Sequence, residues 1–403
     1  MKTNRTLAPA GVTVKMRDIV AGINRVSRGE AVLIQYQEKL RRYLGVHHAF
    51  FVNSGRTALA VILETLKELS GSREVVIPAY TCLSVPSAIV RAGLKVRLCD
   101  ISLDTLDLDI AALEKASDEK VLCVIPSNLF GLVSNLPEIT QIARRYGIFV
   151  IDDAAQSFGA SLQGVKSGTT GDAGIFSLGR GKNITTYEGG VIVTNSGRIA
   201  QRLIRHPLLR TRQLRKWPQF HSLLGLLGYS VFLHPRLYWV PSSLPFLKLG
   251  ESKFDPDFEM EDFSQFQCGL GMLMLQRLDQ LNKQRAQNAL YLYEGLKDNA
   301  HVIMPSPLQG SSPVYLRFPI VILDQSLREN IYQGLLQRKI GVTKMYHTAI
   351  HRISGIHPYL TNGTEQFSNA DRLASSILTL PTHPIVTKMD LDLMLEVIKR
   401  WTH

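Results

Sequence analysis

Cysteine is scarce in this chain and has no metal-binding spacing. No two cysteines form a CxxC pair, and the four of them are scattered through 403 residues as Cys82, Cys99, Cys123 and Cys268. This pattern favours reduced thiols in a cytoplasmic protein and predicts no metal site. The first residues, MKTNRTLAPAG, also lack the apolar core of a secretory signal peptide.

Acidic residues are outnumbered by basic ones, 34 against 46, so the formal net charge is +12 and the pI is near 9.5. This charge is compatible with ordinary solubility, and it also suits an anionic partner such as a nucleotide-sugar or an acidic lipid. No nucleic-acid recognition motif accompanies the charge, so no nucleic-acid partner is expected. Repeats and low-complexity segments are absent, and the apolar content of 45% is that of a globular protein.

One stretch, residues 147–194, combines short apolar runs with polar residues at their ends. The runs are residues 149–151, 174–177 and 189–194. Short apolar runs bounded by Gly and Asp predict buried strands of a parallel sheet. Asp153, Ser177 and Lys182 then lie just beyond strand ends, where open α/β sheets bind ligands.

Three chemistries could use Lys182. A phosphate-binding loop needs G-x-x-x-x-G-K-[ST], but Gly179 is followed by Arg180, and Lys182 is followed by Asn183. An ordinary surface lysine on a turn is the second interpretation. The third is a Schiff-base lysine for pyridoxal 5'-phosphate, with Asp153 holding the ring-nitrogen proton and Ser177 contacting the phosphate. These residues alone leave the second and third open.

Four motifs in order carry a family resemblance. They are D-A-A-Q at Asp153–Gln156, G-D-x-x-x-F-S at Gly171–Ser177, Lys182 five residues further on, and E-G-G at Glu188–Gly190. On these residues the sequence resembles the DegT-type family of sugar aminotransferases. The resemblance extends to Asn53–Leu59, Pro78–Thr81 and Asn369–Pro381, and it fails over about Pro207–Phe258.

The resemblance implies an α/β fold of the pyridoxal-phosphate-dependent aminotransferase type I. A large domain with a mainly parallel sheet sandwiched by helices is expected, followed by a smaller α+β C-terminal domain. The alternation of apolar runs with helical periodicity agrees with this sheet. The predicted boundaries are an arm at 1–28, the large domain at 29–284 with an insertion at about 207–258, and the small domain at 285–403.

A phosphate site is predicted where a helix follows the strand at 49–52. Ser54 and Gly55 would begin this helix, whose free N–H groups can hold a phosphate, although a simply capped helix is the ordinary alternative. The family usually has threonine where this chain has Arg56. The side-chain hydroxyl would then come from Thr57.

The resemblance also implies contacts to the cofactor ring. Cys82 occupies the position of an aromatic residue that stacks on the ring, and a thiol packs there less extensively, so Tyr80 could compensate. Gln156 is implied to contact the ring. Asp152 neighbours Asp153 on one strand and should point to the opposite face in a structural role.

Substrate-side candidates are fewer. Asn128 lies in a loop at the strand ends, where a turn-forming role is the alternative. Tyr346, His347 and His351 match the family's substrate region loosely, and each could equally be a surface residue.

The implied activity is transamination within a homodimer. An amino acid, glutamate or glutamine, would donate its amino group to a keto-sugar on an activated carrier such as a nucleotide. A related branch of dehydratases replaces the lysine with histidine, so Lys182 argues against that chemistry. A non-catalytic regulator or scaffold with the same fold is the alternative of another class.

The insertion carries few charges. No Asp, Glu, Lys or Arg occurs from Trp217 to Pro235, and basic and aromatic residues surround this run. Arg210–Leu247 could therefore lie in the interface of the inner membrane face, with a lipid-linked acceptor. A lid or dimer-interface hairpin that buries the same residues is the alternative.

Overall fold

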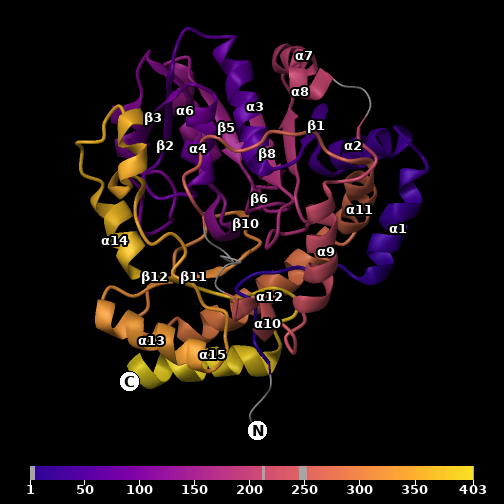
Figure 1. Cartoon of the computed structure of the whole chain (residues 1–403). Coiled ribbons are helices and arrows are strands. Elements are labelled where there is room, and N and C mark those ends of the chain that lie inside the picture. The colour runs from indigo at the N-terminus through magenta and orange to yellow at the C-terminus, as the bar shows by residue number, and fades with distance from the viewer. Residues whose placement is uncertain (1–4, 211–213, 245–251, 403) are drawn as a thin grey trace.

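The computed structural model describes residues 5–210, 214–244 and 252–402. Its centre is a seven-stranded sheet with the strand order β1-β9-β8-β5-β4-β2-β3, visible in the upper half of Figure 1. The strands are β1 (His48–Val52), β2 (Glu74–Pro78), β3 (Lys95–Cys99), β4 (Val121–Val124), β5 (Phe149–Asp153), β8 (Ala173–Ser177) and β9 (Gly190–Thr194).

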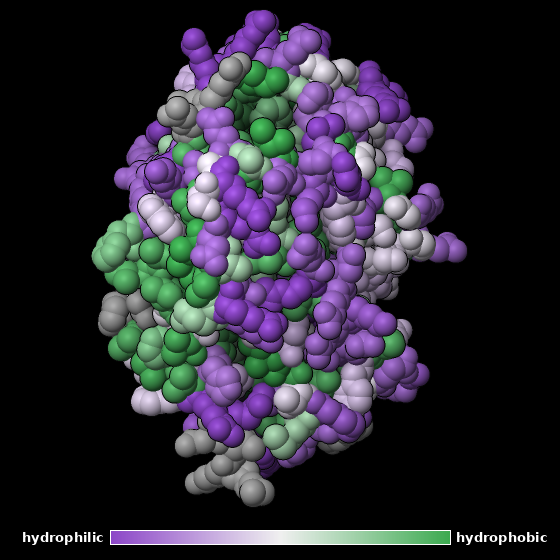
Figure 2. All heavy atoms as spheres, turned by 90° about the vertical axis from the view of Figure 1, so that its right-hand side faces the viewer, coloured by the Kyte–Doolittle hydropathy of each residue, from purple (hydrophilic) through white to green (hydrophobic). Residues whose placement is uncertain are grey.

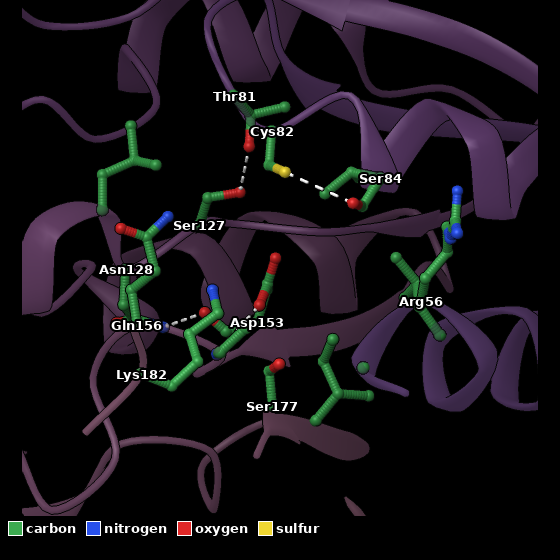
Figure 3. Close-up of a pocket in the computed structure, with 16 residues that line it drawn as sticks. Arg56, Thr81, Cys82, Ser84, Ser127, Asn128, Asp153, Gln156, Ser177 and Lys182 are labelled. Atoms are coloured by element: carbon green, nitrogen blue, oxygen red, sulfur yellow. Dashed lines mark hydrogen bonds between the residues drawn. The ribbon is translucent and has the colours of Figure 1, made fainter. Parts of the chain in front are cut away.

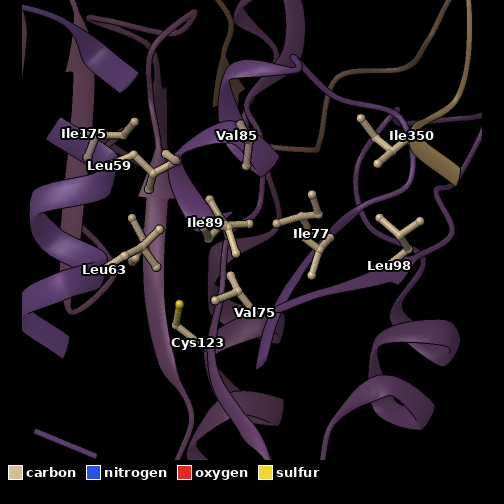
Figure 4. Close-up of a cluster of buried hydrophobic side chains, with 14 of the residues drawn as sticks. Leu59, Leu63, Val75, Ile77, Val85, Ile89, Leu98, Cys123, Ile175 and Ile350 are labelled. Carbon is tan, nitrogen blue, oxygen red and sulfur yellow. The ribbon is translucent and has the colours of Figure 1, made fainter. Parts of the chain in front are cut away.

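Both faces of this sheet are buried because strand side chains alternate in direction. Ile175 of β8 and Ile192 of β9 pack in one hydrophobic cluster, whereas Phe176 and Val191 pack in another on the opposite face. The first cluster, part of which is drawn in Figure 4, includes helices α3 (Gly55–Lys67), α4 (Ser84–Arg91), α7 (Gly197–Arg205) and α14 (Ser368–Ser376). The other face is covered by α1 (Met16–Val26), α2 (Ala31–Leu44), α5 (Ile110–Ala116), α6 (Leu136–Arg145) and α11 (Gln265–Leu275).

The predicted sandwich of helices around a mainly parallel sheet is confirmed, with one strand reversed. Four pairings, β2 with β3, β2 with β4, β4 with β5 and β5 with β8, are parallel. Strand β9 is antiparallel to both β8 and β1, so the prediction of a parallel strand at 189–194 was wrong. The reason is local: the loop after β8 contains no crossover helix and turns back, with Leu178 N donating to Gly189 O at 2.8 Å.

A separate hydrophobic cluster forms the C-terminal part of the chain. Its elements are α12 (Leu278–Leu296), β11 (Phe318–Val321), α13 (Gln325–Gln337), β12 (Ile377–Leu380) and α15 (Lys388–Thr402). Helix α12 runs unbroken across the predicted boundary at 284/285, and that boundary stays a prediction. Within this cluster β11 pairs antiparallel with β12.

The remaining elements in the described residues are a small sheet, three 3-10 helices and the helices of the insertion. A small sheet has the order β10-β6-β7, formed by Ser311–Ser312, Ser161–Leu162 and Val165–Lys166. The 3-10 helices are η1 (Leu129–Gly131), η3 (Ile350–Arg352) and η4 (Ser354–Tyr359). The insertion contains α8 (Pro207–Arg210), α9 (Phe220–Phe232) and α10 (Trp239–Ser242), while 211–213 and 245–251, including the end of the predicted membrane segment, lie outside the described residues. Across the described ranges, none of the helices has the length and apolarity needed to cross a membrane.

Candidate active site

The N-terminus of α3 and the end of β8 meet at one cavity. Ser54 caps the helix, and its Oγ accepts a hydrogen bond from Thr57 N at 3.0 Å. A Cβ on Gly55 would lie 3.0 Å from the Cβ of Ser177, so the close approach depends on glycine. Gly55 and Ser177 both line the cavity. Free helix N–H groups beside a hydroxyl form a site suited to a phosphate.

Lys182 and Asp153 line the same cavity, as Figure 3 shows. Burial lowers the pKa of Lys182, and the charge of Asp153 opposes that shift. Burial also raises the pKa of Asp153, against the effects of the Ala155 N–H at 3.0 Å and of the Lys182 charge. An amine and a carboxylate therefore line the same cavity, and burial shifts the pKa of each toward its neutral form.

Arg285 fixes the loop that carries Lys182. Its guanidinium is fully buried and donates to the carbonyl oxygens of Asn183 at 3.1 Å and Lys182 at 3.5 Å. Burial lowers the pKa of Arg285 to about 10. Sequence reasoning missed this role, since Arg285 is only one of many basic residues on predicted helices.

Four predicted residues lie together beside the cavity, and two of them, Gln156 and Cys82, line it. Gln156 accepts a hydrogen bond from Phe130 N at 3.1 Å and donates through Nε2 to the Tyr346 hydroxyl at 3.3 Å. Tyr346 packs edge-on against Tyr80, with 5.5 Å between ring centroids. Burial raises the pKa of Tyr346, and the nearby Cys82 thiol adds to the shift. The structure thus brings Gln156, Tyr346, Tyr80 and Cys82 together.

The helix α3 residues expected at the phosphate differ from their predicted roles. The Thr57 hydroxyl donates to Asn53 Oδ1 at 2.6 Å, and Thr57 is fully buried outside the cavity lining. Arg56 reaches the insertion, where it pairs with Asp255 at 3.2 Å and lies 4.3 Å from the Phe258 ring centroid. Arg56 still lines the cavity, but its guanidinium contacts Asp255 and Phe258 of the insertion.

Asn128 holds the Asp152 carboxylate and the backbone carbonyl of Asp153 in place. Its Nδ2 donates to Asp152 Oδ1 at 2.7 Å and to Asp153 O at 2.8 Å, and its Oδ1 accepts from Ser134 N at 2.9 Å. Both amide donors of Asn128 are thus used within the protein, and Asn128 also lines the cavity, so its role toward a substrate stays a prediction. Asp152 also accepts from Gly168 N at 2.6 Å, and burial raises its pKa to about 6. Asp152 has the structural role expected of it.

The two histidines predicted at the substrate differ in their surroundings, and the role of His347 stays a prediction. His351 is buried, pairs with Asp371 at 3.2 Å and packs on the ring of Phe367. His347 is exposed. Only Tyr346 from this loop reaches the site, because the backbone turns after it.

Arg317 was not anticipated from the sequence. Its charge acts on Lys182 and Tyr346, which places it at the site. It donates to Pro9 O at 3.3 Å and to Thr343 Oγ1 at 3.4 Å, and burial lowers its pKa to about 10. Within the described part of the chain no carboxylate pairs with this guanidinium, and no cluster of His, Cys, Asp and Glu could hold a metal ion.

Comparison with known proteins decides the family. The profile of the DegT/DnrJ/EryC1/StrS aminotransferase family matches residues 14–399. This chain belongs to that family. Members of the DegT family are pyridoxal-phosphate-dependent sugar aminotransferases.

Several relatives in this family cover most of the chain. GDP-perosamine synthase of Caulobacter vibrioides is 26% identical over 89% of this chain and 87% of its own. The UDP-4-amino-4,6-dideoxy-N-acetyl-beta-L-altrosamine transaminase of Campylobacter jejuni is 26% identical over 87% of this chain and 84% of its own. Helicobacter pylori PseC, an aminotransferase involved in pseudoaminic acid biosynthesis, shares the fold with a TM-score of 0.80, at 19% identity and 99% coverage of both chains.

The donor set of this DegT-family site fits pyridoxal 5'-phosphate. Lys182 supplies a buried amine, and Asp153 supplies a carboxylate in the same cavity. Ser177 and the N-terminus of α3 supply the hydroxyl and N–H groups that a phosphate requires. These residues can hold the cofactor's aldehyde carbon, ring nitrogen and phosphate respectively.

Proposed function

We propose that this enzyme transfers the amino group of glutamate to the keto group of a nucleotide-linked sugar in the cytoplasm. Its product would enter a cell-surface polysaccharide or a related glycan. The observation that carries the proposal is the cavity shared by Lys182, Asp153 and Ser177. The sugars in the relatives' names and the net charge of +12 support an anionic sugar substrate.

The chain's own residues would move and hold protons. When bound, pyridoxal phosphate supplies a ring that accepts the electron pair left as a carbon–hydrogen bond of the amino acid breaks. The Lys182 amine, whose pKa is lowered by burial, can accept that proton and return it to another carbon. The Asp153 carboxylate would hold a proton on the ring nitrogen, while Arg285 keeps the Lys182 backbone in place.

We expect the purified enzyme to cycle spectrally with the correct pair of substrates. Glutamate should convert the visible absorbance of the bound cofactor to that of the amine form, and a suitable nucleotide-linked keto-sugar should restore it. A screen of keto-sugars on nucleotide carriers measures both changes. If glutamate gives the first change but every nucleotide-linked sugar fails to reverse it, this acceptor class is wrong. Absence of any bound cofactor would instead favour the regulator or scaffold alternative.

Arg317 is proposed to bind the α-carboxylate of the amino donor. Arg317 is half-buried, and its guanidinium has no carboxylate partner among the described residues, so an anionic ligand beside Lys182 would be favoured. Arg317→Met is expected to raise the KM for glutamate at least about ten-fold, since charged hydrogen bonds contribute about 1.5–3 kcal/mol. The KM for the keto-sugar should change little. Equal rises for both substrates would contradict this assignment.

A homodimer is also proposed, by analogy with the family's fold. The supporting observation is the position of Arg56, which faces the insertion and leaves the phosphate end of the cavity with backbone donors and Ser177. A second subunit would complete that end. A lipid-linked acceptor is the second candidate substrate, favoured by the exposed apolar side of α9.

A further inference from the structure

Helix α9 has two different apolar sides. Ser222, Leu226 and Tyr229 lie on the side that packs on the protein, and Leu226 is only 1% exposed. The helical repeat places Phe220, Leu224 and Val231 on the opposite side. These three side chains are 74%, 51% and 45% exposed. The outer side of α9 is therefore apolar and exposed among the residues that the structure describes.

The inner side of α9 packs against the loop that carries Lys182. Ser222 Oγ donates to Glu188 Oε2 at 2.7 Å, in the E-G-G motif that ends the loop. A Cβ on Gly225 would lie 2.1 Å from the Tyr187 hydroxyl, so helix and loop are in direct contact there. The helix is thus held in a defined orientation, and its outer side is a fixed surface of the enzyme.

More exposed apolar residues continue this surface around α10. We define the apolar face as the large hydrophobic side chains of residues 214–244 that are exposed, namely Trp217, Phe220, Leu224, Val231, Phe232, Leu237, Trp239 and Leu244. Figure 2 shows hydrophobic residues gathered on the left flank of the molecule. Soluble proteins rarely expose so many large apolar side chains in one segment without a partner.

The charged residues within the segment that carries the apolar face have one sign, although Glu261 pairs with Arg215 and contacts Gln219 just before α9. From Trp217 to Leu244 the sequence contains no Asp or Glu, while Lys216 and Arg236 are exposed at either side of α9. In a symmetric dimer through this face, the Lys216 and Arg236 cations of the two copies would have no carboxylate partner within residues 217–244 of the other copy. An anionic lipid surface would offer both hydrocarbon and negative charge.

We infer that the apolar face docks on an anionic lipid bilayer. Helix α9 has 13 residues and is about 20 Å long, shorter than the roughly 30 Å hydrocarbon core, so the helix lies in the interface plane. Trp217, Tyr238 and Trp239 are residue types that favour this interface. Docking would place the cavity next to lipid-carried sugars, and this last consequence rests on the proposed function.

Vesicle flotation of the full-length protein tests the docking itself. The wild-type protein should float with vesicles containing about 30% phosphatidylglycerol and float far less with pure phosphatidylcholine, and raising salt from about 0.05 M to about 0.5 M should weaken flotation. The combined variant Phe220→Ser, Leu224→Ser and Trp239→Ser should reduce flotation by about ten-fold. These side chains are exposed, so circular dichroism should show an unchanged fold.

Two further variants make the outcome decisive. Ile34→Ser removes a side chain that is 64% exposed on α2, away from the apolar face, and should float like the wild type. Lys216→Glu combined with Arg236→Glu should lose the preference for anionic vesicles. Wild-type protein that stays at the bottom of the gradient in low salt overturns the inference. A triple variant that floats like the wild type also overturns the inference. If the wild type does not float and the triple variant loses a dimer by mass measurement, the apolar face is a dimer interface instead.

Discussion

Replacing Lys182 with alanine is expected to lower turnover by at least about 10³-fold. The variant loses both the amine that attaches the cofactor and the group that moves the proton, and a positioned general acid–base group alone contributes about 10²–10⁴-fold. Because the Lys182 amine is buried in the cavity with Asp153, water should replace it poorly. Steady-state transamination measures the loss. Borohydride should attach the cofactor covalently to the wild-type protein and leave the variant unlabelled.

A control lysine separates this effect from a general loss of charge. Lys39 is exposed on α2, and Lys39→Ala should retain wild-type turnover and borohydride labelling. Circular dichroism should show that the Lys182→Ala protein is folded. If that folded variant kept turnover within ten-fold of the wild type, another group would be the catalytic amine, and the assignment of Lys182 would be wrong.

Gly190→Ala is expected to damage the phosphate end of the cavity. A Cβ at this position would lie 2.0 Å from the carbonyl oxygen of Ser54, and a backbone atom at the start of α3 cannot rotate away as a side chain could. The N-terminus of α3 must therefore move. Overpacking costs about 1–3 kcal/mol of unfolding free energy, and this backbone contact should fall at the upper end. Cofactor affinity should fall at least about ten-fold if the displaced N–H groups bind the phosphate as proposed.

Titration of the apoprotein with pyridoxal phosphate and denaturant unfolding measure the two effects of Gly190→Ala. Gly197→Ala is the matched control, because a Cβ on this first residue of α7 meets no atom within 4 Å. The control should bind cofactor normally and be at least as stable as the wild type, since alanine favours the helix. Normal affinity and stability in Gly190→Ala would show that the start of α3 is not a fixed part of the phosphate site.

The chemistry of this site could be predicted from short stretches of sequence. Asp153 and Ser177 directly end apolar runs, and the carboxyl ends of parallel strands meet at one edge of a sheet, so their shared cavity follows from spacing. Lys182 follows in a loop after the second of these strands. Period-two alternation likewise predicts that Asp152 points away from Asp153. Local pattern was sufficient here because Asp153 and Ser177 end two strands, β5 and β8, that pair directly and in parallel.

Contacts between distant segments were decided only by the tertiary structure. The partners of Arg285 lie about a hundred residues earlier in the chain. Tyr346 lies beside the cavity because it contacts Gln156, whereas His351 is held elsewhere by Asp371. Likewise, the sequence of α9 is apolar all round, so it does not show which side of the helix is buried and which is exposed. One side of that helix is buried because the Lys182 loop lies beneath it, and periodicity carries no information about such a neighbour.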